Sequence, residues 1–154
     1  MKISQVMSRN VKTCHRHDRL ERAAQLMWDH DIGAVPVVDD AGELIGMVTD
    51  RDACMAAYTQ AKPLGALSVD VAMSKHVVTC HPDDTLATVS RLMAKHKIHR
   101  VPVIDDAHRP VGIVSLADLA GAMTRTREIA PNEVASTLAA ICEQRPPMVP
   151  ASQA

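Results

Sequence analysis

The sequence is nearly free of aromatic residues: its 154 residues include no Phe, one Trp and one Tyr. A row of aromatic platforms, on which single-stranded nucleic acid stacks, is therefore excluded. An excess of one charge is also missing, because 17 Lys and Arg stand against 18 Asp and Glu. No basic field attracts a phosphate backbone, so we expect no nucleic-acid partner.

Long apolar runs are absent as well. No stretch of about 18 apolar residues occurs, and the first residues lack the apolar core of a secretion signal, so we expect no membrane span and a cytoplasmic protein. The four cysteines form no C-x-x-C pair and are interpreted as reduced thiols. The eight histidines show no H-E-x-x-H spacing, and no Ser lies in a G-x-S-x-G turn. We therefore predict no enzyme activity, metal site or resident cofactor.

The chain does contain an internal duplication. Residues 7–53 reappear without a gap at 73–119, displaced by 66 positions. Self-similarity of this kind defines the unit of structure, and two copies are too few for a solenoid. We expect the copies to pack as a pseudo-symmetric pair, so that any cleft between them exists twice.

One copy has the pattern of an α/β or α+β unit in the order β-α-β-β-α. Residues 11–14 and 77–80 are expected to be extended, and an amphipathic helix follows, ending near Gly33 in the first copy. The segments 35–38 and 44–48 flank a turn and predict a hairpin. A proline inside the first of these strands indicates a sheet edge or a strand start.

The predicted organisation has five parts. Repeat one covers residues 1–60, a connection covers 61–71 and repeat two covers 72–126. A C-terminal helix covers 127–144, with Pro131 suited to its first turn, and a flexible tail covers 145–154.

Each copy carries a hydroxyl residue and, three positions later, a carboxylate where a strand runs into a helix: Thr49 with Asp52, and Ser115 with Asp118. One interpretation is a ligand site, in which helix amides and the hydroxyl bind phosphate and the carboxylate accepts from a ribose. The other is a helix cap of the capping-box type. The sequence leaves both open.

The copies differ at the next helix-to-strand corner. His99 and Arg100 in the second copy replace Gly33 and Ala34 in the first. Arg can bind a phosphate through its fork of N–H donors, although a basic pair is also favourable at any helix C-terminus. We therefore expect two related but unequal clefts.

The recurring motifs resemble the tandem CBS domain family, named after cystathionine β-synthase. They are Val-Met-Ser, Leu-Met with a following His-x-Ile, Val-Pro-Val-Val-Asp, and Gly-hydrophobic-Val-Thr-x-x-Asp, each present in both copies with small changes. The resemblance covers roughly residues 1–124. It implies two repeats joined into a Bateman module and, commonly, a disc-shaped homodimer formed through helices.

The resemblance also implies a function: a non-enzymatic regulatory module that binds AMP, ADP, ATP or S-adenosylmethionine and signals to a separate effector protein. Asp52 and Asp118 would hold ribose hydroxyls, Thr49 and Ser115 would contact phosphate or ribose, and Arg100, with His99, would reach a phosphate. The adenine would be enclosed by Thr13, Cys14, Ala34, Val35 and Pro36 in one copy, and Thr79, Cys80, Arg100, Val101 and Pro102 in the other. The alternatives are a structural interaction module with vestigial clefts and a redox- or metal-responsive CBS protein.

Overall fold

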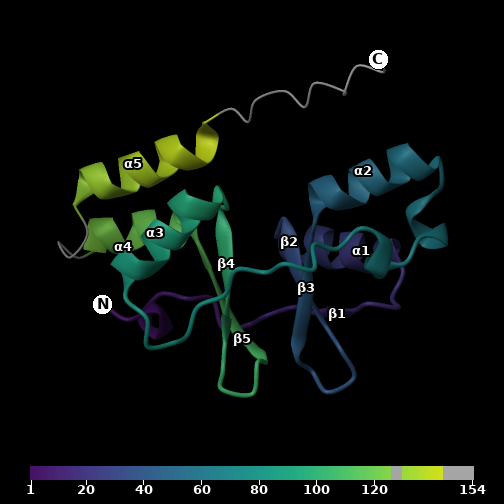
Figure 1. Cartoon of the computed structure of the whole chain (residues 1–154), viewed down its shortest axis with the longest axis horizontal. Coiled ribbons are helices and arrows are strands. Elements are labelled where there is room, and N and C mark those ends of the chain that lie inside the picture. Colours follow the sequence, from purple (N-terminus) through teal and green to yellow (C-terminus); the bar gives the residue numbers. More distant parts are fainter. Residues whose placement is uncertain (126–129, 144–154) are drawn as a thin grey trace, which may run out of the picture.

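Each copy of the duplicated segment folds into an antiparallel strand pair covered by helices, and the two halves stand side by side (Figure 1). The computed structural model describes residues 1–125 and 130–143. The α+β class predicted from the sequence is confirmed. The predicted tail at 145–154 lies outside the described residues. The first half contains β1 (Cys14–His15), α1 (Leu20–His30), β2 (Ala34–Val38), β3 (Leu44–Thr49) and α2 (Asp50–Gln60). The second contains α3 (Leu86–His96), β4 (Arg100–Ile104), β5 (Pro110–Ser115) and α4 (Leu116–Arg125), followed by α5 (Pro131–Cys142).

The expected edge or strand-start position of the proline strand holds in the second half, where β4 with Pro102 belongs to a two-stranded sheet, but not in the first half. In the first half the strand order is β1-β2-β3, so β2 with Pro36 lies in the middle. Pro36 stands opposite Met47, whose amide and carbonyl bond instead to Ser74 at 3.0 and 2.8 Å. Strand β1 pairs with β2 only from Val37 onward. Proline has no backbone N–H, but neither β1 nor β3 presents an acceptor at Pro36. The sheet therefore loses no hydrogen bond there.

The first helix of the first half ends slightly earlier than expected. Helix α1 ends at His30, and Asp31 adopts the left-handed conformation with φ of 52°. Lys97 has the same role after α3, with φ of 53°. Gly33 is not the left-handed cap. Its missing side chain instead leaves room for Arg100. Asp tolerates this backbone region better than most residues, which makes the cap possible without glycine.

The two halves exchange their leading segments. The chain begins beside the second half (Figure 1), where Ile3 and Met7 lie in the core formed by α3, α4, β4 and β5. The equivalent Val69 and Met73 lie in the core of the first half. Isolated bridges Ser8–Ile113 and Met47–Ser74 accompany this crossing. A side chain on Gly46 would stand 2.8 Å from the Met73 sulfur, so glycine is required there for the close approach.

Helix α5 breaks the symmetry of the pair. It begins at Pro131, as expected from the sequence, and packs on α3 and α4 through Val134 and Ile141. A buried hydrogen bond of 2.7 Å joins Ser90 to Thr137. Within the ranges 1–125 and 130–143, no helix is both long and apolar enough to cross a membrane.

Candidate functional site

Both strand-to-helix junctions form the same closed hydrogen-bond motif. In the second half the backbone N–H and the hydroxyl of Ser115 both donate to Asp118 Oδ2 at 2.7 Å, and the Asp118 amide returns a bond of 3.2 Å to Ser115 Oγ. Thr49 and Asp52 repeat this at 2.9, 2.8 and 3.1 Å. The capping interpretation of this motif is therefore confirmed at both helix starts.

The cap leaves part of each junction free for a ligand. In the part of the chain that the structure describes, Asp118 Oδ2 takes both bonds from Ser115, and Oδ1 takes none. A carboxylate oxygen in this state can still accept from a diol. The Ser115 hydroxyl hydrogen, however, is engaged with Asp118, so this oxygen can offer a ligand only a lone pair. The two interpretations of the motif are thus compatible.

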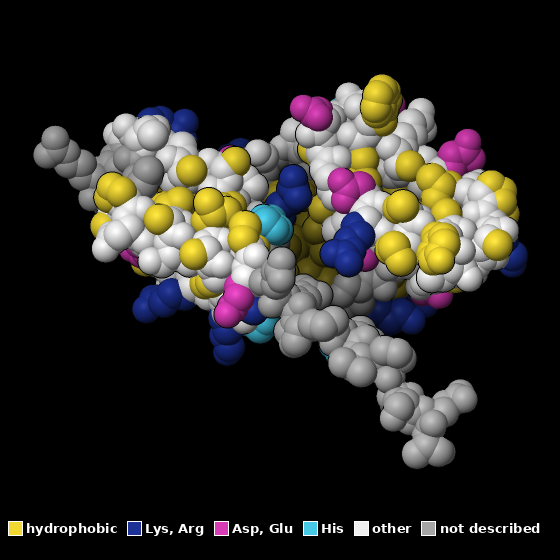
Figure 2. Space-filling view, turned by 90° about the horizontal axis from the view of Figure 1, so that it is seen from above, with side chains coloured by type: hydrophobic (Ala, Val, Ile, Leu, Met, Phe, Trp, Pro, Cys, Tyr) yellow, Lys and Arg dark blue, Asp and Glu magenta, His cyan; other side chains and the backbone are white. Residues whose placement is uncertain are grey.

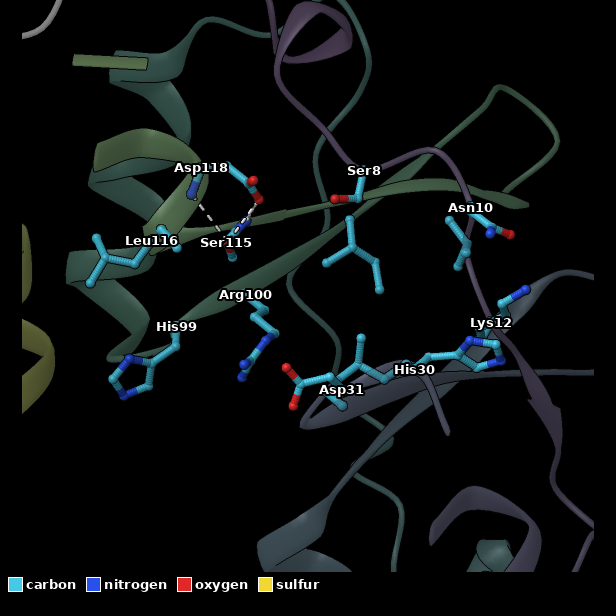
Figure 3. A pocket seen from close by; sticks show the side chains of 15 residues that line it. Ser8, Asn10, Lys12, His30, Asp31, His99, Arg100, Ser115, Leu116 and Asp118 are labelled. Atoms are coloured by element: carbon cyan, nitrogen blue, oxygen red, sulfur yellow. Dashed lines mark hydrogen bonds between the residues drawn. The ribbon is translucent and has the colours of Figure 1, made fainter. Parts of the chain in front are cut away.

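A cavity of about 760 Å³ lies against the second junction, between the two halves. The crossing segment 8–12, the end of α1, the start of β4 and the start of α4 enclose it (Figure 3). Seen from the side of α2 and α5, Lys or Arg, His and acidic side chains border the hollow between the two lobes, and apolar atoms form its floor (Figure 2). Its lining residues are Ser8, Asn10, Val11, Lys12, His30, Asp31, Ile32, Ala34, His99, Arg100, Ile113, Ser115, Leu116, Ala117 and Asp118.

Arg100 projects from β4 into this space (Figure 3). It is exposed, and no carboxylate of the described ranges forms an ion pair with it within 4.0 Å. Both terminal nitrogens of its guanidinium lie 3.5 Å from the point where a side chain on Gly33 would begin. Gly33 therefore provides the room that Arg100 occupies, and an unpaired guanidinium is available to an anion.

The structure brings together five of the residues expected to bind a ligand: Ala34, His99, Arg100, Ser115 and Asp118 line the cavity. Thr49 and Asp52 occupy the equivalent junction in the first half. Cys14, Val35, Cys80 and Val101 are buried in the two cores, Pro36 and Pro102 are buried in β2 and β4, and Thr13 and Thr79 precede the buried cysteines. None of these other residues lines the cavity around Asp118.

The cavity also contains residues that sequence reasoning missed. Lys12 and Asn10 reach it because the chain crosses from the second half to the first at this point. Asp31 reaches it because the left-handed cap turns the chain there. Ile113 and Leu116 also line the cavity, and they could have been identified from the sequence because they adjoin the duplicated motif that contains Ser115 and Asp118. Asn10, Lys12 and Asp31 carried no such signal.

The two buried thiols are poor candidates for redox chemistry. Burial, with a smaller contribution from the Asp18 charge, raises the pKa of Cys14 to about 12. Burial, with a smaller contribution from Asp84, raises the pKa of Cys80 to about 12 as well. The protonated thiol, which is the weaker nucleophile, therefore persists at neutral pH. Since both pKa values lie above the ordinary value of 9.0, the stability associated with these thiols is complete below pH 9 and declines as the pH rises toward about 12.

We expect iodoacetamide at pH 8 to modify the exposed Cys54 and Cys142 of the folded protein and to leave Cys14 and Cys80 unmodified. Peptide mapping by mass spectrometry measures this. All four thiols should react in denaturant, which is the control for reagent access. Rapid modification of Cys80 in the folded protein would support the redox alternative instead.

Comparisons with known proteins agree on one family. The CBS domain model matches residues 3–58 and 67–125. The CBS domain-containing protein YhcV of Bacillus subtilis is 39% identical over 118 residues, covering 77% of this chain and 82% of that protein. Hypoxic response protein 1 of Mycobacterium tuberculosis is 31% identical over 137 residues, covering 89% of this chain and 91% of that protein.

Solved structures lead to the same family. The CBS domain pair of protein MJ0100, in complex with 5′-methylthioadenosine and S-adenosyl-L-methionine, has a TM-score of 0.73 at 30% identity and covers 81% of this chain and 97% of that one. Hypoxic Response Protein I with two coordinated zinc ions has a TM-score of 0.71 at 30% identity, covering 84% and 100%. The chain spans only 22% of the length of a longer relative, the L-aspartate semialdehyde sulfurtransferase of Methanocaldococcus jannaschii. CBS domain pairs are in general regulatory and not catalytic, and both repeats here match their model in order. This chain belongs to the CBS domain family.

Proposed function

We propose that this CBS pair is a regulatory module that binds an adenosine-containing ligand in the cavity beside Asp118 and catalyses no reaction. The observation that carries the proposal is the free Asp118 Oδ1 at the wall of a cavity of about 760 Å³, with the unpaired Arg100 beside it. The cavity volume lies within the range of about 300 to 1,000 Å³ that small-molecule sites occupy. The MJ0100 pair, a structural relative, is known in complex with two adenosine compounds.

The lining residues suit the parts of such a ligand. Asp118 would accept from the ribose hydroxyls, while Arg100 and Lys12 would bind the phosphate. The aliphatic side chains of Ile32 and Ile113 would pack against the adenine. This arrangement requires no aromatic platform, in keeping with a chain that has almost no aromatic residues. The cleft beside Thr49 and Asp52 would provide a second, weaker ribose site.

A ligand in this cavity touches both halves, since the lining comes from the crossing segment, α1, β4 and α4. Binding would therefore favour one relative placement of the halves, and a separate effector protein would respond to that placement. Such regulation requires that the ligand bind one placement more tightly than another. We also propose that the protein acts in the cytoplasm, as expected from its sequence.

The helical face of the first half is proposed as the homodimer contact. Trp28 on α1 and Tyr58 on α2 are 88% and 78% exposed, and Met55 is 44% exposed. They include the only two aromatic residues of the chain. In the second half α5 covers the corresponding helices. Exposed aromatic side chains of this kind contribute strongly at protein interfaces, and light scattering on the purified protein measures the dimer directly.

Isothermal titration calorimetry with AMP, ADP, ATP and S-adenosylmethionine tests the binding proposal. We expect heat of binding with at least one of them, in the micromolar range of dissociation constant that corresponds to roughly 8 kcal/mol of binding free energy. No heat with any adenosine compound would contradict the proposal and favour a structural interaction module with vestigial clefts.

A metal-responsive role is the other candidate, because Hypoxic Response Protein I holds two zinc ions. Across residues 1–125 and 130–143, no group of three or more His, Cys, Asp or Glu is arranged to hold a metal ion. Metal analysis of the purified protein distinguishes this candidate from nucleotide binding.

A further inference from the structure

Two histidines line the cavity beside Asp118, one from each half of the molecule. His30 is the last residue of α1, and His99 immediately precedes β4. Both residues are exposed, and neither imidazole forms a hydrogen bond or an ion pair with another residue that the structure describes. Their ring nitrogens are therefore free to gain a proton or to contact a ligand.

The backbone holds both histidines in the cavity lining. The carbonyl of His99 accepts a hydrogen bond of 2.9 Å from the Leu116 amide, which fixes this corner against the start of α4. After His30, the left-handed Asp31 turns the chain at the cavity wall. In the view of Figure 3, Arg100 and Asp31 lie between the two imidazoles. A ligand in the cavity would therefore meet one histidine from each half.

The permanent charges of the cavity lining cancel. The lining contains two cations, Lys12 and Arg100, and two carboxylates, Asp31 and Asp118. Apart from the histidines, the other lining residues are uncharged. The lining carries no net charge while the histidines are neutral, and it becomes positive when they are protonated. The histidines therefore decide whether the lining as a whole attracts a phosphate.

The charges just outside the lining leave this balance unchanged. Asp50, whose Oδ2 lies beside Gly33, is followed by Arg51, which has the opposite charge. Next to the other histidine, Lys97 forms an ion pair of 2.8 Å with Glu143. Carboxylates, lysine and arginine ordinarily keep their charge between about pH 6 and pH 8, whereas histidine gains one as the pH falls through that range. The lining histidines are thus the groups that add charge to the cavity near neutral pH.

We propose that His30 and His99 make nucleotide binding in this cavity sensitive to pH, so that a phosphate-bearing ligand is held more tightly as the pH falls from about 8 to about 6.5. A phosphate group carries about −1.5 to −2 charges near pH 7, and it favours the protonated form of a neighbouring imidazole. Binding therefore takes up protons, and the added affinity is lost again as the pH rises. The inference rests on the proposed function and specifies how the same site is regulated.

Isothermal titration calorimetry with AMP at pH 8 and at pH 6.5 tests the inference. We expect the wild type to bind AMP about 4-fold more tightly at the lower pH, a modest gain because solvent screens exposed charges. The double variant His30→Gln with His99→Gln should lose this gain, because glutamine keeps hydrogen-bonding groups but cannot gain a proton in this range. Its AMP affinity should stay level or fall slightly at pH 6.5, since the AMP phosphate itself begins to take up a proton. Binding of 5′-methylthioadenosine, which has no phosphate, should change by less than about 1.5-fold in both proteins.

His96→Gln is the matched control. His96 is the last residue of α3, as His30 is of α1, and it is exposed but does not line the cavity. This variant should keep the wild-type change of AMP affinity with pH. The double variant His30→Lys with His99→Lys is charged at both pH values. It should bind AMP at pH 8 at least as tightly as the wild type does at pH 6.5.

Three outcomes separate this inference from the proposed function. The same change of AMP affinity with pH in the wild type and in the double glutamine variant would overturn the role of the histidines and leave the proposed function intact. An equal gain for AMP and 5′-methylthioadenosine at pH 6.5 would do the same, because the phosphate charge would then not be the cause. Absence of heat with both compounds at both pH values would instead contradict the proposed function itself.

Discussion

We expect Asp118→Ala to lower the affinity for AMP by roughly 30- to 150-fold, which corresponds to a loss of about 2 to 3 kcal/mol of binding free energy. The reason is geometric. Asp118 Oδ2 is used by the Ser115 amide and hydroxyl, and Oδ1 would accept from the ribose of the proposed ligand. A carboxylate that accepts from hydroxyl groups forms charge-assisted hydrogen bonds, and no neighbouring side chain at the helix start can replace it. Isothermal titration calorimetry measures the change.

Asp52→Ala is the matched control, because it removes the same cap from the other half. Each variant should lose about 1 kcal/mol of unfolding free energy, as loss of a helix cap usually does. Only Asp118→Ala should lose AMP. Equal AMP affinity in Asp118→Ala and the wild type would exclude the carboxylate from the site, even if nucleotide still binds.

Ile3→Ala lowers the free energy of unfolding by about 2 to 4 kcal/mol, although the residue lies near the start of the chain. Ile3 is fully buried, and its side chain is part of the core of the second half. Its backbone N–H donates to the Asp84 carbonyl at 2.8 Å, which holds the segment in place. Truncation therefore leaves a cavity that the surroundings fill only in part. Urea denaturation followed by circular dichroism measures the loss.

Val71→Ala is the control for a change within the equivalent segment of the first half. Val71 is 51% exposed, so its truncation should alter the unfolding free energy by less than about 0.5 kcal/mol. If Ile3→Ala behaves like Val71→Ala, the leading segment does not contribute to the core of the second half. Concerted loss of both halves in Ile3→Ala would show that the exchanged segments unite them into one cooperative unit.

Local features of the fold were predictable where neighbouring residues alone determine them. The hairpin around residues 39–42 and the caps at Thr49 and Ser115 depend on short-range hydrogen bonds and turn geometry. Features that depend on distant strands were predicted less well. Pro36 was assigned to a sheet edge or a strand start because the sequence could not show that Met47 directs its hydrogen bonds to Ser74, on the far side of β3. The cap after α1 was assigned to Gly33, since Asp31 was not recognised as a left-handed residue.

The sequence by itself determined the duplication, the α+β class and the chemical inequality between Gly33-Ala34 and His99-Arg100. These follow from the order and type of residues along one chain. The tertiary structure alone decided which segments meet at the cavity, because two similar junctions offer no local signal for the crossing of segment 8–12. It also decided that Asp50 and Arg100 share the space beside Gly33. The two residues are 50 positions apart, and only packing in three dimensions brings both of them beside Gly33.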